Sequence, residues 1–219
     1  MRSAGRPAVG SFSRVSAVAA LLFASGGWSL GPAHSQVPGA AKGNTIDRGN
    51  KASDPRGEWQ RVGPSFACKV AVPEKLPPEL LNPLLTRACL HMGPFVIGDA
   101  AQALRVLGAP HRTLPQPNGA VASIYFLETA GQYPYLIATV SKNKIVALQV
   151  TGPAAAKGYD FNHVDLGATT DTLVQYFGQP NHLEPSSEKD TELWAYRPWP
   201  FSFEVRGGHV TSIRISESN

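Results

Sequence analysis

The sequence predicts an α+β fold of two tandem units, each a helix followed by a three-stranded antiparallel sheet, behind an N-terminal helical segment that a disulfide staples. Three observations lead to this prediction: two helical stretches end in Gly-x-Pro, three strand-like runs follow each of them, and two cysteines lie upstream. The expected parts are a signal peptide, a flexible linker, the helical segment, the first unit and the second unit, at 1–35, 36–64, 65–94, 95–158 and 159–219.

The first 35 residues have the features of a secretory signal. Three arginines precede the apolar run Val15–Ala24, and a small-x-small cleavage site follows at 33–35. A membrane-spanning helix needs roughly twenty apolar residues, about twice the length of this run. The protein is therefore expected in the periplasm or secreted, without a stable membrane anchor. Whether the segment is cleaved or retained stays open.

The charge balance argues against nucleic acid as a partner. The chain has 20 Lys and Arg against 16 Asp and Glu, and three of the arginines belong to the expected signal. The remaining 17 basic residues leave a net charge of +1, and they form no cluster. A nucleic-acid-binding surface needs a concentrated positive patch, which this composition does not supply.

Two cysteines, Cys68 and Cys89, are expected to form a disulfide, because an even count in an exported protein favours pairing. Their spacing is too wide for a redox Cys-x-x-Cys motif. Closing a loop of this length is expected to stabilise the fold by roughly 3 kcal/mol. The disulfide is thus predicted to be structural.

The residues around these cysteines predict an unstructured arm and then short helices. Residues 36–64 are rich in Gly, Ala, Lys, Asp, Asn and Pro and show no periodicity, which is typical of a linker. The leucines at 80, 81, 84 and 85 are expected to form the buried face of one or two helices interrupted at Pro83.

The two Gly-x-Pro stretches align without a gap at an offset of 70 and are interpreted as helix ends. Asp99 and Thr169 are expected N-caps, and Asp99 with Gln102 resembles a capping box. Gly108 and Gly178 suit the position after the last helical residue, and a proline two residues later prevents continuation.

Strand-like runs follow each helix. Each set ends in a hairpin whose short turn lies around Lys142-Asn143 in the first unit and at Gly207-Gly208 in the second. One such unit would be marginal alone, so the two are expected to pair. The predicted strands are 121–128, 135–141, 145–151, 192–197, 201–206 and 210–216.

Four short motifs resemble the SmpA/OmlA-like module, and its tandem form is similar to the β-lactamase inhibitor protein (BLIP-like) fold. These motifs are Leu166–Thr169, Phe177–Pro180, Leu193–Tyr196 and Gly208–Ile213, within a resemblance that covers about 95–216. The resemblance implies a noncatalytic protein-binding module, and in the inhibitor a concave sheet face lined with aromatic side chains. The lipobox cysteine that anchors the assembly lipoproteins is absent near the cleavage site.

No catalytic or metal-binding motif stands out, so no catalytic residue, metal ligand or cofactor is predicted. The five histidines outside the signal are at least 19 residues apart and form no ligand pair. No serine lies in a nucleophile-elbow motif, and the glycines form no phosphate-binding loop. The sequence thus predicts a protein that is not an enzyme. The alternatives are a periplasmic enzyme with a dispersed active site and a small-ligand or cell-wall binding protein.

Aromatic residues are the candidate binding residues, since large amphipathic rings on an exposed sheet commonly anchor protein interfaces. Each of them could instead pack in the core. The expected function is an exported noncatalytic module that binds a protein of the cell envelope, in envelope assembly or in inhibition of a periplasmic enzyme. The candidates are Trp194, Tyr196 and Trp199 in the second unit and Tyr125, Tyr133 and Tyr135 in the first.

Overall fold

The computed structural model describes residues 57–72, 74–128 and 131–217. The expected signal peptide and the first part of the expected linker lie outside these residues. The helical elements are α1 (Pro78–Cys89), η1 (Ala101–Leu107), η2 (Pro117–Gly119) and α2 (Thr170–Phe177). The strands are β1 (Glu58–Val62), β2 (Ser65–Lys69), β3 (His91–Met92), β4 (Phe95–Val96), β5 (Arg112–Pro115), β6 (Val121–Phe126), β7 (Tyr135–Ser141), β8 (Lys144–Thr151), β9 (His182–Pro185), β10 (Thr191–Ala195), β11 (Phe201–Arg206) and β12 (His209–Ser216).

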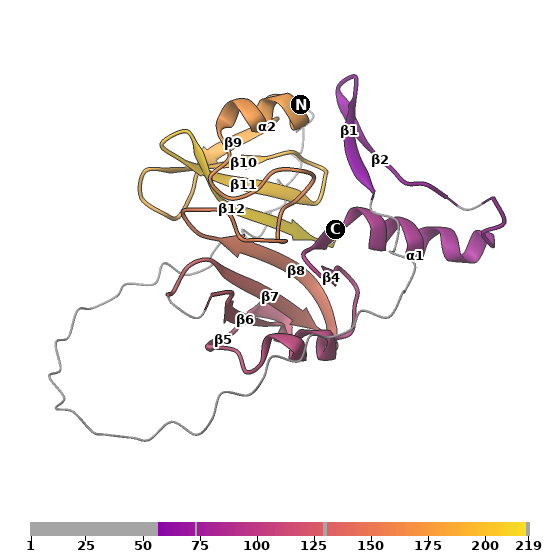
Figure 1. Ribbon diagram of the computed structural model, residues 1–219, viewed down its shortest axis with the longest axis horizontal. Helices are drawn as coiled ribbons and strands as arrows, with labels where there is room; N and C mark the ends of the chain where they lie inside the picture. The colour runs from indigo at the N-terminus through magenta and orange to yellow at the C-terminus, as the bar shows by residue number, and fades with distance from the viewer. Residues whose placement is uncertain (1–56, 73, 129–130, 218–219) are drawn as a thin grey trace, which may run out of the picture. The chain divides into compact units, whose positions relative to one another are not determined.

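Eight strands form one antiparallel sheet in the order β5-β6-β7-β8-β12-β11-β10-β9 (Figure 1). Four strands follow η1 and four follow α2, so the predicted units of a helix and three strands are wrong in their strand number. The two missed strands, β5 and β9, are the short edge strands Arg112–Pro115 and His182–Pro185. Each has one leucine and ends in proline, so neither shows the alternation by which a strand is recognised.

The predicted hairpin turns are confirmed. Lys142 and Asn143 both have positive φ angles (47° and 63°), as do Gly207 and Gly208 (58° and 79°). Two successive residues of this kind give a turn whose twist matches the flanking strands. The two hairpins are joined because β12 pairs with β8, placing Ile213 opposite Val150. This central pairing makes the eight strands one sheet.

The second helix begins and ends as predicted, whereas the first does not begin at its predicted cap. Thr169 Oγ1 accepts a hydrogen bond from the Thr172 amide, and Gly178 follows the last turn of α2 with φ 70°. In the first half Ala100 is the N-cap, and the element is a 3-10 helix. The Asp99 backbone is hydrogen-bonded to Ile145, and its carboxylate contacts Arg87 Nη1 at 2.8 Å. The Asp99 carboxylate is thus paired with Arg87, and no side-chain hydrogen bond caps η1.

The N-terminal segment combines a β-hairpin and a helix. This differs from the predicted linker, which was expected to extend to residue 64, and from the predicted helical segment 65–94. Residues Glu58–Val62, expected in a linker, form β1 and pair with β2. Helix α1 follows, but its Leu80 and Leu81 are 49% and 37% exposed rather than buried. The predicted disulfide is confirmed: Cys68 and Cys89 are bonded and join β2 to the end of α1.

One face of the large sheet packs in the core with the helices and the hairpin. The strand registers place six core residues side by side across it, and each is at most 8% exposed. Leu104 of η1, Phe177 of α2 and Phe66 of β2 pack in the same cluster. The six core residues, from β6 to β10, are Tyr125, Leu136, Val150, Ile213, Phe203 and Trp194.

Candidate functional site

The other face of the sheet, here called the open face, presents the alternate residues of the same strands. Among the described residues, the apolar cluster on this face consists of side chains from β5, β6 and β7 alone. No described helix contributes to that cluster. Two cross-strand rows of the open face matter here. One consists of Phe126, Tyr135, Thr151, Ser212 and Glu204, and the other of Ile124, Ile137, Gln149, Arg214 and Ser202.

One end of the open face is aromatic. The His111 and Phe126 rings lie 4.1 Å apart, and the Tyr133 and Tyr135 rings lie 5.4 Å apart. Tyr133 is 50% exposed, whereas Phe126 and Tyr135 are partly buried. Burial raises the pKa of the Tyr135 phenol. Partly exposed aromatic rings of this kind are typical of protein interfaces.

A polar network occupies the centre of the open face, on the paired strands β8 and β12. Gln149 Nε2 donates to Ser212 Oγ at 2.9 Å, and the hydroxyls of Ser212 and Thr151 are 3.1 Å apart. Arg214 Nη1 donates to Gln149 Oε1 at 3.3 Å. Ser212 is only 1% exposed, and its hydroxyl is hydrogen-bonded within the network. The network therefore places one partly buried guanidinium among neutral hydrogen-bonding groups.

The charge on this network is only partly compensated. Burial lowers the pKa of Arg214, and the nearby Glu204 carboxylate opposes this effect. Glu204 Oε1 accepts a hydrogen bond from Ser186 at 2.7 Å. Among the described residues no acidic side chain is in salt-bridge contact with Arg214. An arginine side chain has five N–H donors, and among the described residues the Arg214 guanidinium makes one hydrogen bond, to Gln149.

Three of the six candidate aromatics lie in the core instead of on the open face. Tyr125, Trp194 and Tyr196 are 7%, 8% and 1% exposed. The Tyr196 hydroxyl donates to the Gly178 carbonyl at 2.9 Å, and Trp194 Nε1 donates to Glu192. Both polar groups are thus satisfied inside the chain, as packing of such residues requires.

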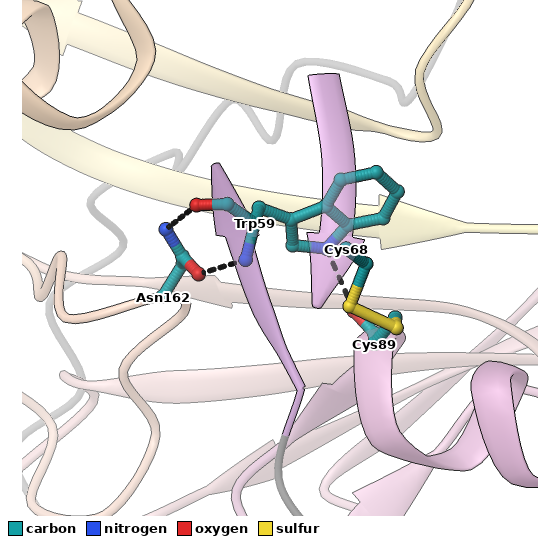
Figure 2. The surroundings of a disulfide bond; sticks show 4 residues. All are labelled: Trp59, Cys68, Cys89 and Asn162. Carbon is teal, nitrogen blue, oxygen red and sulfur yellow. Dashed lines mark hydrogen bonds between the residues drawn. A yellow bond between two sulfur atoms is a disulfide. The ribbon is translucent and has the colours of Figure 1, made fainter. Parts of the chain in front are cut away.

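Trp199 is partly buried beneath the N-terminal hairpin. Its ring lies 6.0 Å from that of Trp59 and 6.1 Å from that of Phe66. The Asn162 amide holds Trp59 by accepting from its backbone N–H at 2.6 Å and donating to its carbonyl at 3.0 Å (Figure 2). Trp59 Nε1 donates to the Cys89 carbonyl at 2.9 Å, next to the disulfide. The β1–β2 hairpin therefore covers the region around Trp199, which was considered as a binding residue from the sequence.

Tyr133 and Tyr135 are the predicted site residues that the structure places at the open face. Phe126, Gln149 and Arg214 share that face but were not among the site residues predicted from the sequence. The sequence did contain a signal for Gln149. Side chains alternate along a strand, so Gln149 faces away from the apolar Leu148 and Val150 and toward the other side of the sheet. The cross-strand partners could not be identified without the register.

No helix within the described parts of the chain is both long and apolar enough to cross a membrane. Over the same residues, no group of three or more His, Cys, Asp or Glu side chains is arranged to hold a metal ion. The structure thus assigns no metal ligands to the described residues.

Comparison with known proteins shows no family. No family model matches the chain, and no curated protein matches it. Among solved structures, an extracellular protein containing an SCP domain from Bacillus anthracis is 14% identical with a TM-score of 0.36, over 55% of this chain and 44% of that one. This chain thus spans less than half of that protein's length.

Two further solved structures also have low sequence identity to this chain. A DUF4309 family protein from Bacillus subtilis is 16% identical with a TM-score of 0.37, over 52% of this chain and 75% of that one. A protein proposed to be a β-lactamase inhibitor, from Streptococcus mutans, is 14% identical with a TM-score of 0.22, over 57% and 86%. No argument about this chain rests on these three likenesses.

Proposed function

We propose that this protein is an exported, noncatalytic module that binds a protein partner through the open face of its sheet. The observation that carries the proposal is the asymmetry of the two faces. One face packs against η1, α2 and the β1–β2 hairpin, while the other presents partly exposed aromatic and polar side chains in register. Aromatic anchors beside satisfied polar groups are the usual composition of a protein interface.

Export is part of this proposal and rests on two features. The first 35 residues resemble a secretory signal, and the disulfide between Cys68 and Cys89 suits an oxidising compartment. The partner is accordingly a protein of the cell envelope. Two roles fit such a module: assembly of the envelope, as the SmpA/OmlA-like motifs suggest, and inhibition of a periplasmic enzyme, as the BLIP-like resemblance suggests.

The proposal can be tested by site-specific photo-crosslinking in the intact envelope, with mass spectrometry of the products. A photoreactive residue replaces Phe126 or Tyr133, both at the aromatic end of the open face. The control position is Val106 on η1, which is 74% exposed and lies outside the open face. The expected result is one protein partner crosslinked from the first two positions and not from Val106.

Two results would contradict this function. Equal crosslinking from Val106 would show that the contacts are unrelated to the open face. Recovery of the protein with a tightly bound small molecule and no crosslinked protein would favour the small-ligand alternative. Each variant should be checked for an unchanged urea unfolding midpoint, so that a lost crosslink is not the result of misfolding.

A further inference from the structure

We infer that the partner presents an aspartate or glutamate side chain to Arg214, next to an apolar side chain that contacts Phe126 and Tyr135. This inference rests on the proposed function and specifies the chemistry of the partner. Arg214 is on β12, which pairs with β8 at the middle of the eight-stranded sheet. A ligand seated on the open face at its centre would therefore meet this guanidinium.

Charge complementarity identifies the occupant. Arg214 is partly buried and donates to the neutral Gln149 amide, and no described carboxylate is in salt-bridge contact with it. Glu204, the nearest acid in the cross-strand pattern, is opposite Ser212 on the same face; its charge acts on Arg214 from beyond salt-bridge distance, and its carboxylate is hydrogen-bonded to Ser186. A guanidinium fork matches a carboxylate in shape and in charge, with two parallel hydrogen bonds.

The neighbours of Arg214 hold its guanidinium in position to meet a carboxylate. Gln149 and Ser212 join it in one hydrogen-bonded network, so the guanidinium is held in place before a ligand arrives. A preorganised group loses less conformational entropy on binding than a free surface arginine. The aromatic pair Phe126 and Tyr135 lies on adjacent strands along the same face, where it can hold an apolar side chain next to the acid.

The test is selection from a phage-displayed random peptide library against the full chain. Wild-type protein is expected to enrich peptides with Asp or Glu next to an apolar residue. Changing that acid to Asn or Gln in a selected peptide should weaken binding by about tenfold to a hundredfold. Arg214→Gln should cause a loss of the same size, and Arg214→Glu should shift the enrichment toward Lys or Arg.

Arg112→Glu is the matched control, because Arg112 lies on the same cross-strand row but is exposed on the edge strand β5. It changes the net charge by the same amount as Arg214→Glu and should leave the acidic preference intact. The inference is overturned if no acidic residue is enriched, if amide substitution in the peptide changes nothing, or if Arg112→Glu acts like Arg214→Glu. The amide substitutions in the peptide test the acidic contact even where an Arg214 variant fails to fold.

Rejection of the acidic contact at Arg214 can be told apart from rejection of protein binding at the open face. Crosslinking from a photoreactive residue at position 126, in a protein that keeps Arg214, tests for a protein partner at the open face and does not depend on the chemistry of the Arg214 contact. A crosslinked partner together with an Arg214→Gln variant that retains full affinity would retain the function and reject the acidic contact. Absence of any partner at Phe126 would reject both.

Discussion

Replacing Asn162 with alanine is expected to release the β1–β2 hairpin from the core. The Asn162 side chain makes two hydrogen bonds to the backbone of Trp59, at 2.6 and 3.0 Å. Each such bond contributes about 1 kcal/mol net. Asn162 also has φ 50°, a conformation that costs alanine about 1 kcal/mol more than asparagine. The expected loss in the free energy of unfolding is therefore about 3 kcal/mol, of which about 2 kcal/mol comes from the two hydrogen bonds that dock the hairpin.

Asn143→Ala is the matched control for the backbone term. Asn143 has φ 63°, it is exposed, and its side chain makes no hydrogen bond among the described residues. Its replacement should cost only about 1 kcal/mol. Hydrogen exchange of the β1 and β2 amides measures hairpin docking, in which Asn162→Ala should lose the two hydrogen bonds, about 2 kcal/mol or roughly 30-fold in protection, beyond any loss that Asn143→Ala causes. Equal losses in the two variants would refute the reasoning that the Asn162 amide holds the hairpin.

Three further predictions concern stability. Reducing or replacing Cys68 and Cys89 should lower the free energy of unfolding by about 3 kcal/mol in urea titrations, and no effect of reductant on the unfolding midpoint would contradict this. Burial raises the pKa of Tyr196 above its ordinary value of 10.0, so the folded protein binds the phenolic proton more tightly than the unfolded chain does. The free energy of unfolding should therefore fall as pH rises beyond about 10, and Tyr196→Phe should flatten that decline. Thr169→Ala removes the cap of α2 and should cost about 1 kcal/mol in thermal unfolding, whereas Thr169→Ser should cost less.

Local patterns were sufficient for much of the sheet. Residues 135–141 and 201–206 are strands at the predicted boundaries, and the turn at Gly207-Gly208 is where two glycines allow positive φ. These features depend on neighbours in sequence, through alternation and turn geometry. The edge strands β5 and β9 could not be predicted in this way, because pairing with a neighbouring strand, rather than their own residues, makes them strands.

The candidate site depended far more on non-local contacts. Alternation divides LWAYRPWPFSFEV into two sets of side chains, but it does not say which set is covered. In the structure Phe66, from the N-terminal hairpin, packs on Tyr196 with ring centroids 5.7 Å apart. Phe66 was predicted to lie in a helical segment, and no local pattern in the sequence brings it to this strand. Tyr196 is therefore in the core, and the surface is on the other side of the sheet.

By itself the sequence determined the helix stops, six of the strands and the pair of cysteines, because each is set by short-range stereochemistry or by simple counting. The tertiary structure alone decided that β8 pairs with β12, that the hairpin covers one face, and that Arg214 lies at the centre of the other. These outcomes require residues far apart in the chain to compete for the same apolar surface. Burial of that surface, which is a property of the whole fold, selects the face that remains available for a partner.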